Sequence, residues 1–250
     1  MATVVVHADP PRTGLVLDRL VETSPLSPDE AVDLYVALLR DAVVAAEESG
    51  GEPLVNYRPD ELLPEKHRRE VETEAAVRAA LDGALAEPGA VRFEKQVGST
   101  RAARIGNTVT HLLENEGQNV VVVDPAAPLA GRTAIDQAAM KLRSSDVVLA
   151  PGTAGRVALM AFGAAPDFEA ALAPPAVETL TARAIEADLD VDFLPVEPVV
   201  ETGADLAGLI SILQARAEAG RIVPEFTAES VTKLGLTVAT EDGNPTVRRQ

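Results

Sequence analysis

The sequence predicts an α/β protein in which helices cover a single sheet of parallel strands. Short runs of β-branched residues alternate along the chain with longer segments of helical periodicity. The central run, residues 120–123, is four consecutive valines, as expected for a strand buried on both faces of a parallel sheet. Asp124 and Pro125 follow directly, so a polar loop begins where this strand ends. Ligands of open α/β sheets bind at such strand ends, so Asp124 is either a metal or ribose ligand or a residue that only initiates the turn.

The predicted strands are short, apolar and rich in β-branched residues. They cover residues 3–7, 53–57, 91–96, 120–123, 146–149, 157–162 and 190–195. Residues 198–202 are predicted as a short strand or a loop. The strand order is left open, since the pattern fixes only the alternation of strands with helices.

The predicted helices lie between the strands. Residues 28–48 have the strongest start signal, because Ser27 can cap the helix, Pro28 suits its first turn and Glu30 completes a capping box. Thr202 is predicted to cap residues 204–219. The remaining predicted helices are a short one starting within 15–21, a charged one at 65–85, and those at 100–116, 132–142, 174–187 and 227–234.

Residues 1–240 are predicted as one domain, because no repeat or low-complexity linker divides them. The polar residues 241–250 are predicted as a disordered tail. The basic cluster 66–69 is interpreted as a solvated face of its helix.

The composition is strongly acidic, with a net charge of −17. This charge disfavours nucleic acid and anionic membranes as partners. Lysine is rare and arginine makes up most of the 22 basic residues, which favours a halophilic protein adapted to a salt-rich cytoplasm. The chain has no cysteine, so disulfides and thiolate chemistry are excluded. No apolar stretch is long enough for a membrane span and the N-terminus lacks signal-peptide features, so a cytoplasmic location is expected. A homo-oligomer is compatible with the sequence but nothing argues for it.

Several catalytic motifs are missing from the sequence. There is no G-x-G-x-x-G after a strand, no P-loop and no G-x-S-x-G elbow, so an oxidoreductase on a dinucleotide-binding fold is disfavoured. The three histidines are too far apart for a zinc set. The loops at the predicted strand ends remain, and they hold polar residues suited to phosphates or a metal. The candidate phosphate partners are Arg12, Arg101, Arg104 and Arg156, and the candidate oxygen ligands for Mg²⁺ or Mn²⁺ are Asp124 and Glu201.

Taken in order, these loops resemble those of the selenodomain-associated transferases, a group of nucleotide-diphospho-sugar transferase-like proteins with the GT-A fold. The resemblance runs from Val4 to Leu213. The family opens with K-A-P-x-P-G-x-V-K-T-R-L, and residues 9–20 here read D-P-P-R-T-G-L-V-L-D-R-L. Further matches lie at Gln96 and Gly98, in the A-P-G-T-A-G-R-V-A-L stretch of residues 150–159, and in the V-V-E-T-G-A-D-L stretch of residues 199–206.

This resemblance implies a single three-layer α/β domain with a mixed, mostly parallel sheet. It also implies a glycosyl- or nucleotidyltransferase that binds a nucleotide or nucleotide-sugar at the carboxyl ends of the strands, with Mg²⁺ or Mn²⁺. The implied metal ligands are Asp124 and Glu201. The implied nucleotide-binding residues are Pro11, Arg12, Gly14, Arg19, Gly98, Gly155 and Arg156.

The charged positions of the family motifs are less well kept than the glycines and prolines. Asp9 and Leu17 stand where the family has lysines. Ala126, Ala154 and Val199 stand where acids are expected, and Asp124 lies two residues before the expected metal ligand. Two hypotheses follow: an active metal-dependent transferase, or a catalytically degenerate relative that serves as a nucleotide-binding or partner-binding scaffold.

Overall fold

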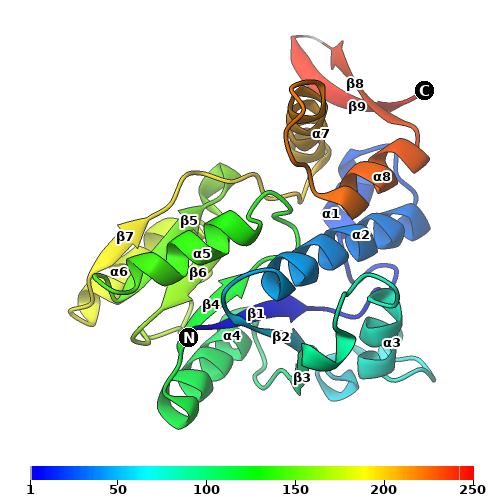
Figure 1. Cartoon of the computed structure of the whole chain (residues 1–250). Coiled ribbons are helices and arrows are strands. Elements are labelled where there is room, and N and C mark those ends of the chain that lie inside the picture. Colours follow the sequence, from blue (N-terminus) through cyan, green and yellow to red (C-terminus); the bar gives the residue numbers. More distant parts are fainter. Residues whose placement is uncertain (1, 242) are drawn as a thin grey trace.

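The computed structural model describes residues 2–241 and 243–250. Its centre is a seven-stranded sheet of order β3-β2-β1-β4-β6-β5-β7 (Figure 1). The strands are β1 Ala2–Ala8, β2 Glu52–Tyr57, β3 Arg92–Lys95, β4 Asn119–Val123, β5 Val147–Pro151, β6 Val157–Phe162 and β7 Val191–Phe193. The predicted strands therefore all form, with end points shifted by a few residues.

The sheet is mixed and mostly parallel, as the family resemblance implies, so the prediction of parallel strands from the alternation of elements is wrong for β6. Strand β6 pairs antiparallel with both β4 and β5, whereas the other pairings are parallel. The reason lies in the connection between β5 and β6, which is only the short turn η5 Thr153–Gly155 with its flanking residues. So short a link can join antiparallel strands, but a parallel crossover needs about a dozen residues.

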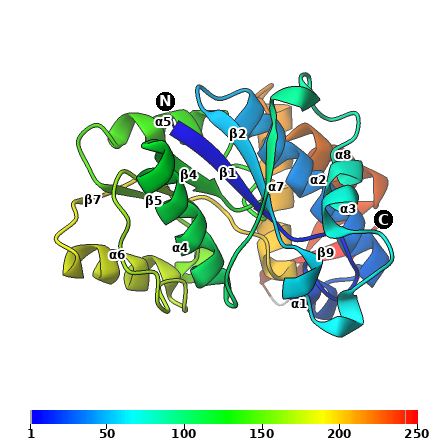
Figure 2. The same ribbon diagram turned by 90° about the horizontal axis from the view of Figure 1, so that it is seen from below.

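Two helical layers cover the sheet, so the domain has three layers (Figures 1 and 2). In β1, Val4 and Val6 belong to one core cluster and Val5 to the other, as the two-residue period of a strand requires. Helices α2 Pro28–Glu47, α3 Thr73–Ala80 and α5 Arg132–Lys141 contribute to the first core. Helices α4 Arg101–His111 and α6 Ala176–Glu186 contribute to the second.

A third apolar cluster lies on the outer side of α2. It joins α1 Asp18–Thr23, α7 Gly203–Glu218, α8 Glu225–Lys233 and the antiparallel hairpin of β8 Leu236–Glu241 and β9 Asn244–Arg249. Figure 1 shows this hairpin at the edge of the molecule, beside α7 and α8 and away from the main sheet. Among the described residues, none of the helices combines the length and the apolar character that a membrane crossing needs.

The prediction of a disordered tail at 241–250 is wrong for residues 244–249. This segment forms β9, which pairs with β8 over its whole length. Val247 is buried in the third cluster, and Arg249 binds the carboxylate of Glu30 on α2. The polar composition hid the strand because only one of its side chains is buried.

The prediction of one helix over 65–85 is also wrong, since only Thr73–Ala80 is α-helical. The preceding backbone is kept from continuing the helix because the guanidinium of Arg12 donates hydrogen bonds to the carbonyls of His67 and Val71, at 2.7 and 2.8 Å. The Asp60 carboxylate then accepts a hydrogen bond from the backbone N–H of Thr73 at 2.9 Å, where the helix begins. His67 is buried, so the cluster 66–69 is not wholly a solvated face.

Candidate functional site

A cavity of about 430 Å³ opens at the carboxyl ends of β4 and β5. Segments far apart in the sequence meet there, as expected for this edge of an α/β sheet. The charged residues that line it are Arg19, Arg101, Asp124, Arg156, Glu201 and Asp205. The uncharged residues are Ala154, Gly155, Val157, Met160, Leu172, Pro174, Ala176, Val199 and Thr202.

Arg19 and Arg156 share the carboxylate of Glu201. Nη1 of Arg19, on α1, donates to Oε2 of Glu201 at 3.0 Å. Nη1 of Arg156, after η5, lies 3.1 Å from the same oxygen. The structure therefore brings together three residues that the sequence analysis proposed for the site, from segments about 45 to 180 positions apart.

Asp205 fixes the position of Arg156. Its Oδ1 accepts from Nη2 of Arg156 at 2.6 Å, and its Oδ2 accepts from Nη1 at 3.0 Å, a bidentate pair. The same carboxylate closes the capping box at the start of α7, where Thr202 is the predicted N-cap. Burial opposes ionisation of Asp205, but the hydrogen bonds from Arg156 and Thr202 outweigh it and lower the pKa of its carboxyl. Asp205 is thus a fixed anion that organises this wall of the cavity.

Asp124 initiates a turn, which is one of its two predicted roles, and it also pairs with an arginine. Its Oδ1 accepts from the backbone N–H of Ala126 at 2.9 Å, so it initiates the turn after β4. Its Oδ2 accepts from Nη2 of Arg101 at 2.8 Å, at the first residue of α4. Asp124 lines the cavity, but each of its oxygens already has a partner.

The donor set does not fit a divalent cation. Mg²⁺ and Mn²⁺ take several oxygen ligands, usually with at least one free carboxylate. Here Asp124 and Glu201 are each paired with a guanidinium, and the expected acid positions hold Ala126, Ala154 and Val199. Across residues 2–241 and 243–250, no group of three or more histidine, aspartate or glutamate side chains is arranged to hold a metal ion.

Four of the predicted nucleotide-binding residues do not line this cavity. Arg12 is buried and donates to Asp60 and to two backbone carbonyls, so its guanidinium is committed to the fold. Pro11 and Gly14 lie in the same β1–α1 loop. Gly98 precedes α4 with φ +131°, and a Cβ there would lie 3.0 Å from the backbone N of Arg104. Gly98 therefore allows a close approach of loop and helix.

A buried polar cluster lies next to the cavity, at the end of β1. Gln96 donates from Nε2 to the carbonyls of Ala8 and Asn56, at 3.1 and 2.7 Å. Nε2 of His7 and Nε of Arg104 are buried without a hydrogen-bond partner among the described residues. Burial, followed by the charges of Arg101 and Arg104, holds the pKa of His7 well below its usual value, so its ring is neutral.

The apolar wall of the cavity was not predicted. Val157 and Met160 come from β6, while Leu172 and Ala176 come from the loop before α6 and from its first residue. The connection between β5 and β6 turns at Gly155. Its φ of +73° and its close approach to Pro175 suit only glycine. The signal in the sequence was the A-P-G-T-A-G stretch, but the antiparallel placement of β6 could not be read from it.

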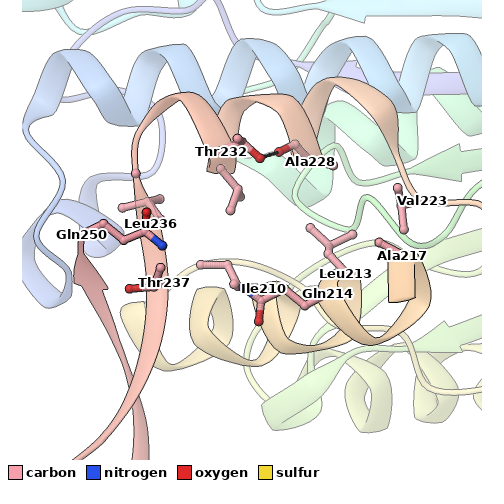
Figure 3. Close-up of a pocket in the computed structure, with 12 residues that line it drawn as sticks. Ile210, Leu213, Gln214, Ala217, Val223, Ala228, Thr232, Leu236, Thr237 and Gln250 are labelled. Carbon is pink, nitrogen blue, oxygen red and sulfur yellow. Dashed lines mark hydrogen bonds between the residues drawn. The ribbon is translucent and has the colours of Figure 1, made fainter. Parts of the chain in front are cut away.

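A second hollow of about 250 Å³ lies between α7, α8 and the β8–β9 hairpin (Figure 3). Among the residues that the structure describes, its lining contains no charged side chain. Leu213 and Leu236 face it from opposite sides, and the hydroxyl of Thr232 is turned to the carbonyl of Ala228 in its own helix. Without a charged donor, this hollow is poorly suited to phosphates, so the edge cavity is the candidate site.

No protein-family model matches the sequence, and no curated protein matches it. The structure is similar to that of a provisionally named nucleotide-diphospho-sugar transferase from Desulfovibrio desulfuricans G20, with a TM-score of 0.75 and 18% identity over 93% of this chain and 95% of that one. The fold is that of the nucleotide-diphospho-sugar transferases. The resemblance stated from the sequence is therefore confirmed at the level of the fold.

Two further similarities are weaker. A cytidylyltransferase from Leptospira borgpetersenii serovar Hardjo-bovis (strain JB197) has a TM-score of 0.50 and 10% identity, over 93% of this chain and 94% of that one. A Mycobacterium tuberculosis H37Rv protein in complex with manganese has a TM-score of 0.44 and 15% identity, over 84% of this chain and 97% of that one.

Proposed function

We propose that this protein binds a nucleotide or nucleotide-sugar in the edge cavity, as a nucleotide-diphospho-sugar transferase-like protein. The observation that carries the proposal is the convergence of Arg19, Arg101 and Arg156 on one cavity at the carboxyl ends of the strands. Guanidinium groups are well suited to phosphate oxygens because they donate several hydrogen bonds in one plane.

The reaction class that this site favours is glycosyl or nucleotidyl transfer. In both, negative charge develops on phosphate oxygens as the bond to the leaving group breaks. In this proposal Arg19 and Arg101, the more exposed arginines of the cavity, stabilise that charge, and Met160 and Leu172 provide an apolar surface for the rest of the ligand.

A specific observation favours the second candidate, a catalytically degenerate relative that binds a nucleotide or a partner as a scaffold. Ala126, Ala154 and Val199 cannot act as acids, and Asp205 is bound to Arg156 and to its own helix cap. The nucleotide-binding form of this candidate differs from the transferase only in turnover, whereas the partner-binding form predicts no nucleotide binding.

The resemblance to metal-dependent transferases suggests Mg²⁺ or Mn²⁺ as a cofactor, with Asp124 and Glu201 as the ligands. Binding it would require both carboxylates to give up their arginine partners. We further propose that the acidic composition is an adaptation to high salt, because a net charge of −17 is tolerated best where salt screens self-repulsion.

The experiment is a thermal-shift panel of nucleoside mono-, di- and triphosphates and nucleotide-sugars, in concentrated KCl. A ligand at about 100 times its Kd stabilises the folded state by about 2.7 kcal/mol, which for a protein of this size raises Tm by roughly 5–10 °C. Nucleosides without phosphate are the matched control and should give a much smaller shift.

A panel in which no nucleotide raises Tm more than its nucleoside contradicts the proposed function. If a nucleotide binds, release of nucleoside diphosphate from the matching nucleotide-sugar, or of pyrophosphate from the matching nucleoside triphosphate, separates the two candidates. Measurable release supports an active transferase, and binding without release supports the scaffold.

A further inference from the structure

The carboxylates of the cavity have little hydrogen-bonding capacity left. Both oxygens of Asp205 accept from Arg156, and Oδ2 also accepts from the backbone N–H groups of Glu201 and Thr202. Both oxygens of Asp124 are occupied as well. Only Glu201 keeps an oxygen, Oε1, for which the described residues offer no partner. One carboxylate oxygen without a partner is less than the one or two carboxylates that usually hold Mg²⁺ together with water and phosphate oxygens.

The guanidinium groups of Arg19 and Arg101, in contrast, have N–H donors without an acceptor among the described residues. Each arginine carries five N–H donors. In the part of the chain that the structure describes, the side chain of Arg19 donates only to Glu201, and that of Arg101 only to Asp124. Their side chains are 69% and 48% exposed, so the unused N–H groups are accessible.

Arg156 plays a different part. It is 18% exposed and is tied to Asp205, Glu201 and Thr153 at once. It therefore holds Glu201 in place, and Glu201 in turn holds Arg19. The carboxylate of Asp124 raises the pKa of Arg101, and Asp9 and Glu201 act in the same direction, so Arg101 lies within the field of the same acids.

We infer that the cavity binds the phosphates of its ligand without a divalent cation, with Arg19 and Arg101 supplying the charge and the donors that a metal supplies elsewhere. This inference rests on the proposed function, since it concerns how the same cavity holds its nucleotide. The unused capacity of the site consists of donors, and donors select an anion over a cation.

The experiment is calorimetric titration of the intact protein with UDP, CDP, GDP and ADP, each in excess EDTA and again with excess Mn²⁺. At least one of the four is expected to bind with the same Kd in EDTA and in Mn²⁺. The variants Arg19→Gln and Arg101→Gln should each weaken that binding in EDTA by about 10- to 100-fold, the usual effect of losing a charged hydrogen bond.

The matched control is Arg132→Gln. Arg132 is an arginine on α5 of similar exposure, 62%, whose one ion pair among the described residues is with Asp136, and it does not line the cavity. Its Kd should equal that of the unmodified protein. Circular dichroism of each variant checks that the fold is kept, which is expected because Arg19 and Arg101 are exposed.

Electron paramagnetic resonance with Mn²⁺ alone gives an independent readout. Addition of the protein should leave the signal of free Mn²⁺ unchanged. Loss of that signal, or nucleotide binding that requires Mn²⁺, overturns the inference and leaves the proposed function intact. Failure of all four nucleotides to bind in either condition overturns both.

Discussion

Asp205 offers the sharpest test of how the cavity wall is built. Its carboxylate has two tasks, since it closes the capping box of α7 and pairs with both terminal nitrogens of Arg156. The substitution Asp205→Ala removes both. It also leaves the guanidinium of Arg156 without its closest partner, with Glu201 as the remaining carboxylate.

The magnitude follows from the burial of the pair. Loss of a helix cap costs about 1 kcal/mol. Breaking a fully buried ion pair costs about 3–5 kcal/mol, and this one, with side chains 18% and 11% exposed, should cost about 2–3 kcal/mol. Asp205→Ala is therefore expected to lower the free energy of unfolding by about 3–4 kcal/mol, or Tm by roughly 6–15 °C.

The assay is urea unfolding followed by circular dichroism in concentrated KCl. Asp205→Asn keeps the acceptor for the helix cap but loses the charge. It should lower the free energy of unfolding by about half as much as Asp205→Ala. The control is Glu186→Ala, which removes an exposed pair with Arg183 and should change stability by less than about 0.5 kcal/mol. If Asp205→Ala lowers the free energy of unfolding no more than Glu186→Ala does, the role given to Asp205 is wrong.

Three further predictions concern residues around the site and at the end of the chain. Arg104 is 5% exposed, and its side chain has no hydrogen bond or ion pair among the described residues, so Arg104→Met should raise the free energy of unfolding by about 1 kcal/mol or more; a loss of stability in urea unfolding contradicts this. Because the pKa of buried His7 lies well below 6.5, the unfolded chain binds a proton on this residue below pH 6.5 that the folded protein does not. Stability should therefore fall as the pH drops below 6.5, by at most about 1.4 kcal/mol per pH unit for this group, and His7→Gln should flatten that slope; an unchanged slope counts against the neutral ring. Leu236 is buried in the third cluster, so Leu236→Ala should cost about 2–4 kcal/mol in thermal or urea unfolding, whereas a hairpin that does not pack on α7 predicts no change.

Much of the fold could be predicted because its signals are local. The four valines of β4 and the capping box at Ser27 depend on neighbouring residues only, and both appear as predicted. The prediction of a single domain over 1–240 stays a prediction. The helix proposed over 65–85 failed because its backbone is set by Arg12, a residue more than 50 positions away. The β9 strand was not predicted because a strand at the edge of a hairpin buries few side chains and so lacks an apolar pattern.

The site could be predicted only in part, for the same reason. Arg101, Asp124, Gly155, Arg156 and Glu201 line one cavity, as the convergence of strand ends predicts, and Arg19, which only the family resemblance implied, lines it too. Tertiary contacts decide which arginine faces the cavity. The sequence predicts Arg12 as a phosphate partner, but in the structure its guanidinium donates to the carbonyls of His67 and Val71. Asp205 belongs to the family-like stretch of residues 199–206, but its pairing with Arg156 was not predicted because the two residues are 49 positions apart.

Location of the bound nucleotide tests the central claim most directly. The measurement is photo-crosslinking of the intact protein with an azido-substituted nucleoside diphosphate, followed by mass spectrometry of the labelled peptides. The account predicts labels on residues of the edge cavity, in the segments around Gly155–Met160 and Leu172–Ala176, and their loss when unlabelled nucleotide competes. Competed labels confined to the hollow between α7, α8 and the hairpin, or to any other surface, would contradict it.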